Sequence, residues 1–421
     1  MLKKVKLLLS DKLTKNIGWL AASQVFRRVI RIALVVVLSR ALTTEEYGLM
    51  AILFAITDFA NVFIRKGGIA PKLIQAKKEE LDGLLNTAYW ANWILCLSIF
   101  TIQCLMAFPI SLFYQDEKLI LPIMVAALAY LVNPFYAVQD ALIRRENRLK
   151  IGAIAMALNA LINQSLIIVF ALMGMGIWCI AISLVISQMT WLVVYRKNHS
   201  WVPSGKFTLK NWKDIFNFSK FPLGIEMLNY LRSNIDYILI GRFFSVEQLG
   251  LYFFAFNAGL GLSLTAINMV SNSVFPYLCE ARDNLPTLKK NYVRSLKTCA
   301  AIIFPVVLLQ SSLAPIYVPI VFSEKWIPAI PILIMICLSA LPRPFAIVSE
   351  QLLLATDRGM DGLKWNVFFT IVVTISIVIA AQFNIFLVAA VVLAVHLLLL
   401  PVFTFLVSRS LFSGKASLFV S

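Results

Sequence analysis

The sequence predicts an all-α polytopic membrane protein with about twelve transmembrane helices. Of its 421 residues, 60% are hydrophobic and 14% are charged, whereas roughly 25% are charged in a typical soluble domain. The hydrophobic residues form blocks of about twenty, the length that crosses a hydrocarbon core as a helix. Residues 368–381 and 386–400 contain no Asp, Glu, Lys or Arg. Helices of this composition face lipid or other helices rather than water.

Each apolar block predicts one span, and the connections between blocks are short. The expected spans are residues 17–39, 47–65, 84–108, 118–141, 152–173, 175–195, 219–240, 248–275, 295–321, 327–351, 364–382 and 385–408.

The positive charge alternates between the two sides of these spans. The formal net charge is +17, but the Lys and Arg residues recur in separate loops, such as residues 144–150, and do not form one nucleic-acid-binding patch. The intervening loops, such as Thr43–Glu46 and Met173–Gly176, have little net positive charge. The positive-inside rule therefore places both chain ends in the cytoplasm.

An internal repeat divides the chain. Ser39–Leu49 matches Gly241–Leu251 at an offset of 202 residues, at Arg, Glu, Gly and Leu positions. Because six expected helices separate the copies, both halves enter the membrane in the same direction, as in a parallel transporter repeat. We expect a six-helix bundle over residues 1–200 and a second over residues 201–421. An amphipathic pattern over residues 207–216 predicts an interfacial linker helix before the second bundle.

The sequence offers no catalytic or metal constellation. His199 and His396 have no Cys, Asp or Glu nearby at ligand spacing, and the six cysteines show no metal or redox spacing. A P-loop is absent, which argues against a direct ATP-driven pump. We therefore expect no metal, no cofactor and no enzymatic activity.

Ionisable residues inside the spans are the candidates for function, because each costs roughly 2.5–3.5 kcal/mol at a helix centre. Two interpretations compete. The groups form helix–helix ion pairs, for example Asp58 with Arg28 or Arg31, or they line a water-filled cavity between the halves. Arginine suits an anionic ligand, since its planar fork binds phosphate oxygens at two points. Arg28 also lies low enough to reach the headgroups. The expected substrate-binding residues are Arg28, Arg31, Arg232 and Arg343, and the expected ion-coupling residues are Asp58, Asp236 and Glu350.

Prolines inside the spans predict bends. Pro342-Arg343-Pro344 is the clearest case, because it places a cation beside carbonyls that a broken helix leaves without donors.

Several motifs resemble the polysaccharide transporter family, which includes Wzx-type flippases of O-antigen and capsule biosynthesis. They are Leu38–Met50, Asp58-Phe59-Ala60, Gly67–Gln75, Asn234–Tyr252 and Val274–Pro276. The resemblance is clear over about residues 17–280 and only hydropathic afterwards. It implies the multidrug/oligosaccharidyl-lipid/polysaccharide exporter fold, with two six-helix bundles around a central cavity.

The resemblance also implies a function: moving an undecaprenyl-pyrophosphate-linked oligosaccharide across the bacterial inner membrane by alternating access. Membrane lipid, a polysaccharide polymerase and a chain-length regulator are the implied partners. Two alternatives remain open. A drug or cation exporter of the same superfamily would need an acidic or aromatic cavity, and a non-transporting scaffold would need none of the buried charges.

Overall fold

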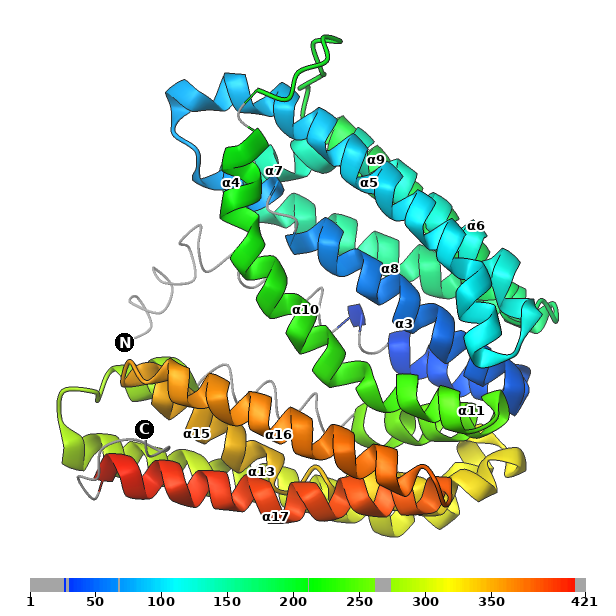
Figure 1. The fold of residues 1–421 in the computed structure, drawn as a ribbon, viewed down its shortest axis with the longest axis vertical. Helices are drawn as coiled ribbons and strands as arrows, with labels where there is room; N and C mark the ends of the chain where they lie inside the picture. The colour runs from blue at the N-terminus through cyan, green and yellow to red at the C-terminus, as the bar shows by residue number, and fades with distance from the viewer. Residues whose placement is uncertain (1–25, 28–29, 67–68, 211, 262–273, 413–421) are drawn as a thin grey trace, which may run out of the picture. The chain divides into compact units, whose positions relative to one another are not determined.

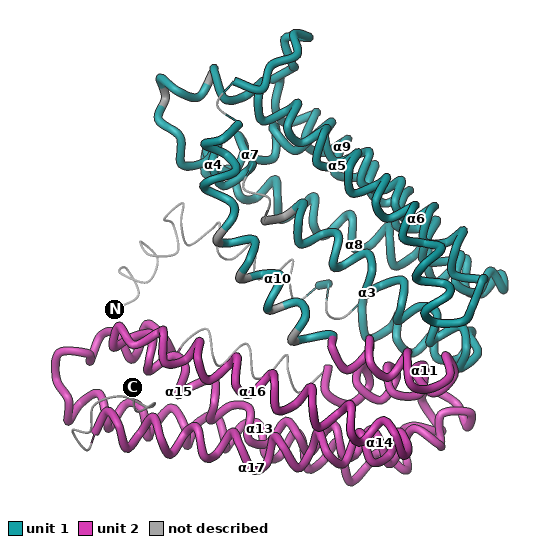
Figure 2. Tube along the Cα trace, viewed as in Figure 1, with its two compact units in different colours: residues 1–234 teal, residues 235–421 magenta. Residues whose placement is uncertain are grey.

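The computed structural model describes residues 26–27, 30–66, 69–210, 212–261 and 274–412. All regular secondary structure in these ranges is helical (Figure 1). The chain divides into two compact units, Met1–Asn234 and Ile235–Ser421 (Figure 2). This boundary falls inside a helix, 34 residues beyond the expected division after residue 200, and each unit is described below by itself.

Unit 1 consists of long helices joined by tight turns. A helix over residues 30–41 precedes α3, and α5 packs against α6 while α8 packs against α9. The helices of unit 1 are α3 (Thr44–Lys66), α4 (Ile69–Gln75), α5 (Lys78–Tyr114), α6 (Ile120–Val132), α7 (Ala137–Arg145), α8 (Leu149–Leu172), α9 (Trp178–Asn198) and the first part of α10 (Trp212–Phe243).

Unit 2 repeats this plan. Its helix α11 (Val246–Ala255) continues into a π-helical turn, η3 (Phe256–Leu260). The later helices are α13 (Leu285–Tyr317), α14 (Ile330–Leu338), α15 (Arg343–Ala355), α16 (Gly359–Ala380) and α17 (Ile385–Phe412). In both units the second helix of the α5–α6 or α13–α14 pair breaks and then resumes, as α7 or as α15.

Nine segments within the described ranges are long and apolar enough to cross a membrane, and each corresponds to one expected span. The protein is thus a multi-pass helical membrane protein. The other three expected spans include residues 17–39 and 248–275, which lie partly outside the described residues. Residues 219–240 lie in the continuous helix α10, which does not meet the same composition criteria. The count of twelve therefore stays a prediction.

Two helix interruptions occur where proline removes backbone donors, whereas Pro305 and Pro315 lie inside the uninterrupted helix α13. Between α6 and α7, Asn133–Phe135 forms a 3₁₀ turn, η2, around Pro134. Helix α14 ends at Leu338 and α15 begins at Arg343, so the expected break at Pro342-Arg343-Pro344 is confirmed.

The region before α10 differs from the expected interfacial helix. Residues 199–210 contain no helix, and α10 runs without interruption from Trp212 into the expected seventh span. Pro203 and Gly205, whose φ is +75°, lie just before the amphipathic pattern and disfavour a helix there. The apolar face that the sequence predicted on residues 207–216 is therefore shared between an irregular segment and the first turns of α10.

Candidate functional site

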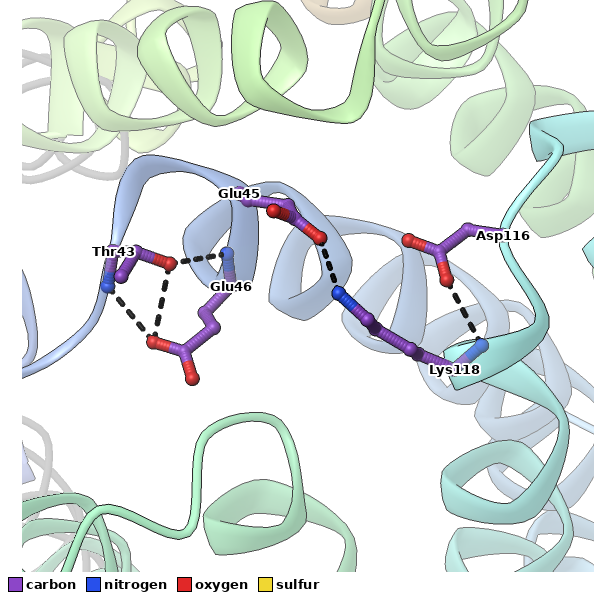
Figure 3. A network of polar contacts seen from close by, with 5 residues as sticks. All are labelled: Thr43, Glu45, Glu46, Asp116 and Lys118. Atoms are coloured by element: carbon purple, nitrogen blue, oxygen red, sulfur yellow. Dashed lines mark hydrogen bonds and ion pairs between the residues drawn. The ribbon is translucent and has the colours of Figure 1, made fainter.

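At one end of unit 1, helix α3 begins with a side-chain cap, shown in Figure 3. The amide of Glu46 donates to Thr43 Oγ1 (3.1 Å), and Glu46 Oε2 accepts from the amide of Thr43 (2.8 Å). This reciprocal pair is a capping box, which supplies partners to groups that a helix start leaves open. Beside it, Lys118 Nζ lies 2.7 Å from Glu45 Oε1. We call this region, comprising Thr43–Glu46, Gln115–Lys118 and Met173–Gly176, the Thr43 end of unit 1.

The internal repeat is explained by this cap. In unit 2, the side chain of Ser245 accepts from the amide of Gln248 (3.2 Å) at the start of α11. Ser245 and Gln248 lie 202 residues after Thr43 and Glu46. The similarity at this offset therefore reflects two helix starts that use the same kind of side-chain cap. It does not indicate a substrate.

A chain of neutral side chains crosses the interior of unit 1. Asn92 Nδ2 donates to Asn133 Oδ1 (2.9 Å), Asn133 Nδ2 donates to the hydroxyl of Tyr136 (3.2 Å), and that hydroxyl donates to Gln188 Oε1 (3.1 Å). Amides and phenols satisfy one another here without charge. This network joins α5, η2 and α9, and we interpret it as structural.

The carboxylate of Asp58 is exposed on α3 and interacts electrostatically with the hydroxyls of Tyr130 and Tyr230. Tyr130 donates to Gln103 Oε1 (3.0 Å), and Tyr230 donates to the carbonyl of Ala55. Asp58 is therefore placed beside fixed phenols in unit 1.

Asp236 is a half-buried carboxylate in unit 2. Its Oδ2 accepts from the hydroxyl of Tyr252 (3.1 Å), and its Oδ1 accepts from the amide of Tyr237 (3.0 Å). Arg343 interacts electrostatically with Asp236, Tyr252 and His396. The structure thus places two of the sequence-predicted site residues, Asp236 and Arg343, near enough for their charges to interact.

Glu350 occupies a different part of unit 2. Its Oε1 accepts from Asn366 Nδ2 (2.7 Å), which links α15 to α16. The side chain is half-buried.

A second repeat, which the sequence reasoning missed, relates Glu350 to unit 1. Pro134-Phe135, Asp140 and Asn147-Arg148 match Pro344-Phe345, Glu350 and Asp357-Arg358 at an offset of 210 residues. The structure aligns them, because Asn147 (φ 57°) and Asp357 (φ 58°) both adopt the left-handed conformation that ends a helix. The alignment was detectable, but its offset differs from 202, so a search at a single period overlooks it.

The two copies differ in how the acid is paired. Asp140 Oδ1 accepts from Arg144 Nε at 2.8 Å. Burial lowers the pKa of Arg144, but the carboxylate of Asp140 outweighs this effect and the pKa lies above its ordinary value. The residue equivalent to Arg144 in unit 2 is Leu354. The acid is thus held by an arginine in unit 1 and by the neutral amide of Asn366 in unit 2.

The four predicted substrate-binding arginines are placed unevenly. Arg28 lies outside the described residues, and Arg232 lies in α10 with its side chain outside them. Arg31 is exposed on the helix over residues 30–41. Arg343 is the half-buried first residue of α15, and its equivalent in unit 1 is Asn133. Among the described residues, no group of three His, Cys, Asp or Glu side chains could hold a metal ion.

Solved structures with similar folds are membrane transporters. The lipid II flippase MurJ in an inward closed conformation superposes with a TM-score of 0.75 at 14% identity, covering 92% of this chain and 86% of its own. An inward-facing multidrug resistance MATE family transporter of the MOP superfamily gives 0.70 at 14% identity, covering 93% and 96%. At these identities the comparison establishes the fold alone.

The sequence relatives include biosynthesis proteins for teichuronic acid and for lipopolysaccharide. The teichuronic acid biosynthesis protein TuaB of Bacillus subtilis (strain 168) is 26% identical over 95% of this chain and 82% of its own length. The lipopolysaccharide biosynthesis protein WzxC of Escherichia coli (strain K12) is 25% identical over 89% and 76%. Residues 37–331 match the family model described as "polysaccharide biosynthesis protein". Because this match covers more than half of the sequence, the chain belongs to the polysaccharide biosynthesis protein family, which confirms the resemblance drawn from its motifs.

Proposed function

We propose that this protein is a flippase that moves undecaprenyl-pyrophosphate-linked oligosaccharides across the bacterial inner membrane for O-antigen or another surface polysaccharide. Transport proceeds by alternating access, without ATP hydrolysis. The sugar and pyrophosphate enter a polar cavity while the prenyl tail stays in lipid. Both chain ends lie in the cytoplasm, and a polysaccharide polymerase and a chain-length regulator are the expected partners.

Arg343 is the observation that supports this substrate most directly. It is the first residue of α15, the end of the helix at which the helix dipole favours an anion. The equivalent residue at the break in unit 1 is the neutral Asn133. A cation at an interrupted helix inside a lipid-embedded unit suits a phosphorylated headgroup. In the proposal Arg28, Arg31 and Arg232 complete the headgroup site.

Coupling to a proton or sodium gradient is assigned to Asp58, Asp236 and Glu350. The comparison of the two repeats favours Glu350, because its counterpart Asp140 is already neutralised by Arg144 at 2.8 Å. A carboxylate held by an amide changes its charge more easily than one held by an arginine.

A drug or cation exporter of the same fold is the second candidate function, and the similarity to a MATE family transporter favours it. The excess of arginine over acid among the predicted site residues opposes it. A non-transporting scaffold would tolerate neutral substitutions at all of these positions.

The test is complementation of a flippase-deficient strain by variants of Arg343 and Arg31. Arg343→Ala and Arg31→Ala should each abolish surface polysaccharide, and lipid-linked oligosaccharide should accumulate. Lysine at either position should restore activity only in part, because an ammonium group lacks the planar fork. Arg282→Ala is the matched control, since Arg282 is exposed and pairs with the adjacent Asp283 (3.6 Å). Full activity of both alanine variants at normal abundance would remove the headgroup assignment.

A further inference from the structure

The irregular segment that leads into α10 is fixed to unit 1. Trp90 Nε1 donates to the carbonyl of Lys206 (2.9 Å), and Thr87 Oγ1 donates to the carbonyl of Lys210 (2.7 Å). We call residues 199–210 the linker segment. Side chains of α5 thus supply the donors that a helix or strand would otherwise provide to these carbonyls.

Two further bonds hold the start of the linker segment. Asn86 Oδ1 accepts from the amide of Ser204 (3.1 Å), and Gln139 Nε2 donates to the carbonyl of Trp201 (3.0 Å). All four bonds are to the backbone of the linker segment. These bonds therefore do not use the side chains of Val202, Lys206, Phe207 or Lys210.

The side chains that the linker segment and the first turns of α10 expose are apolar and basic. Val202 is 75% exposed, Phe207 63%, Trp212 48% and Phe216 58%. Ile215, in contrast, is buried against the core of unit 1. Large exposed apolar side chains gathered on one segment mark a surface that contacts a partner.

Charge identifies the partner. Residues 196–220 contain six Lys or Arg and a single acidic residue, Asp214. Lys206, Lys210 and Lys213 are all exposed beside the apolar side chains. Aromatic side chains with interspersed lysines are typical of segments that lie in a bilayer interface containing anionic lipid.

The position of the linker segment beside the start of α5 agrees with a lipid partner. Trp201 lies 6.1 Å from Tyr89 and Phe207 lies 5.3 Å from Trp90, measured between ring centroids. Tyr89 and Trp90 lie near the start of the apolar part of α5, where Tyr and Trp form the aromatic belts of membrane proteins. The linker segment is thus held beside aromatic residues at the end of an apolar helix.

We propose that residues 202–210 together with residues 212–216 form a docking surface for anionic lipid headgroups. Phe207, Trp212 and Phe216 enter the interface, and Lys206, Lys210 and Lys213 contact the phosphates. The bonds from α5 and α7 hold the backbone at the depth this requires. The proposal concerns a lipid surface and does not depend on the transported substrate.

The test is hydrogen exchange of peptides covering residues 202–216 in the full-length protein. The protein is placed in nanodiscs of dioleoyl-phosphatidylglycerol or of dioleoyl-phosphatidylcholine. Exchange should be slower in the anionic lipid by roughly fivefold or more, the effect of about one well-placed lysine. The triple variant K206Q/K210Q/K213Q should remove this difference, whereas K77Q/K290Q/K297Q, with the same change in charge at exposed lysines elsewhere, should keep it.

Three results would overturn the proposal. The first is equal exchange of the wild-type segment in both lipids, and the second is a lipid difference that survives in K206Q/K210Q/K213Q. The third is protection reproduced by inorganic phosphate in phosphatidylcholine nanodiscs, which would show a free-anion site instead. Phe207→Ser should raise exchange in both lipids, because it removes an apolar anchor without touching the four bonds to the backbone.

Discussion

At the scale of single residues, the contact between Glu46 and Gly176 determines how the Thr43 end of unit 1 closes. Gly176 has a φ of +53°, and a Cβ built on it would lie 2.5 Å from Glu46 Oε1. Gly174 has a φ of +76°, and its Cβ would meet nothing within 4 Å. The two glycines therefore share the left-handed backbone but differ in the space around them.

Alanine at these two positions should separate backbone strain from steric conflict. Gly174→Ala should destabilise the protein by about 1 kcal/mol through the left-handed conformation alone. Gly176→Ala should cost about 1–3 kcal/mol more, since Glu46 must leave its bonds to Thr43. Thermal unfolding in detergent, followed by tryptophan fluorescence, should rank wild type above Gly174→Ala and Gly176→Ala lowest. Equal melting temperatures for the two variants would show that the Glu46 contact is unimportant.

The paired acids of the second repeat give a prediction about coupling. Glu350→Gln should keep the protein abundant, because glutamine can still accept from Asn366, and should reduce transport by about tenfold or more through loss of a titratable group. Asp140→Asn should act mainly on stability, by about 1 kcal/mol, because it weakens the partly exposed pair with Arg144. Complementation, corrected for abundance by immunoblotting, distinguishes the two effects. If Asp140→Asn proves the more damaging to transport, the repeat comparison has assigned the wrong acid.

At the scale of elements, the side chain of Gln310 supports η3, the π-helical turn that follows α11 in unit 2. Its Nε2 donates to the carbonyls of Ala258 (2.8 Å) and Gly259 (2.7 Å), both in the π-helical turn. A π-turn leaves carbonyls without their usual helical donors, and such turns concentrate at functional positions. The side chain of α13 thus compensates for the interruption that follows α11.

Removing this support should have a measurable cost. Gln310→Leu removes the side-chain donor that these two carbonyls share, so we expect a loss of about 1–3 kcal/mol. Gln103 is the equivalent residue in unit 1 at an offset of 207 residues, and its Nε2 donates to a single carbonyl, that of Ile123 (2.9 Å). Melting temperatures of Gln310→Leu and Gln103→Leu should both fall. A Gln310→Leu protein as stable as wild type would mean that the turn needs no support from α13.

Elements with strong hydropathy were predictable, whereas the linker segment was not. Nine expected spans correspond to apolar helices because twenty apolar residues in lipid leave no alternative to a helix. The linker segment depends on two donors, Thr87 and Trp90, and on one acceptor, Asn86, all of which lie more than a hundred residues earlier in the chain. Periodicity over residues 207–216 carries no information about such distant partners, so the amphipathic pattern was assigned to a separate helix.

The contacts of the candidate site also depend on residues that are distant in the sequence. Sequence identified Asp236 and Arg343 as buried charges worth noting, but their electrostatic interaction joins segments more than a hundred residues apart. For Arg343, the two interpretations given by the sequence, an ion pair and a ligand site, do not exclude each other. An arginine whose charge interacts with Asp236 can also bind a phosphate, because its planar fork suits oxyanions.

At the scale of the whole molecule, the orientation of the chain depends on α10. This helix has 32 residues, or about 48 Å at 1.5 Å per residue, enough to cross a core of about 30 Å. It also contains Glu226, Arg232 and Asp236, so its composition alone does not establish that it spans the membrane. If it does, the linker segment and Ser245 lie on opposite sides.

Reporter fusions should decide this. Alkaline phosphatase is active only outside the cytoplasm, so fusions after Asp116 and Ser245 should be active, and fusions after Lys206 and Thr356 should be inactive. Green fluorescent protein at the same positions should give the reverse pattern and controls for expression. The physical reason is the alternation of basic and charge-poor loops, which fixes each turn relative to the next. Matching reporter activity after Lys206 and Ser245 would place α10 on one side of the membrane. An even count of twelve spans, and the parallel relation of the two repeats that depends on it, would then both be wrong.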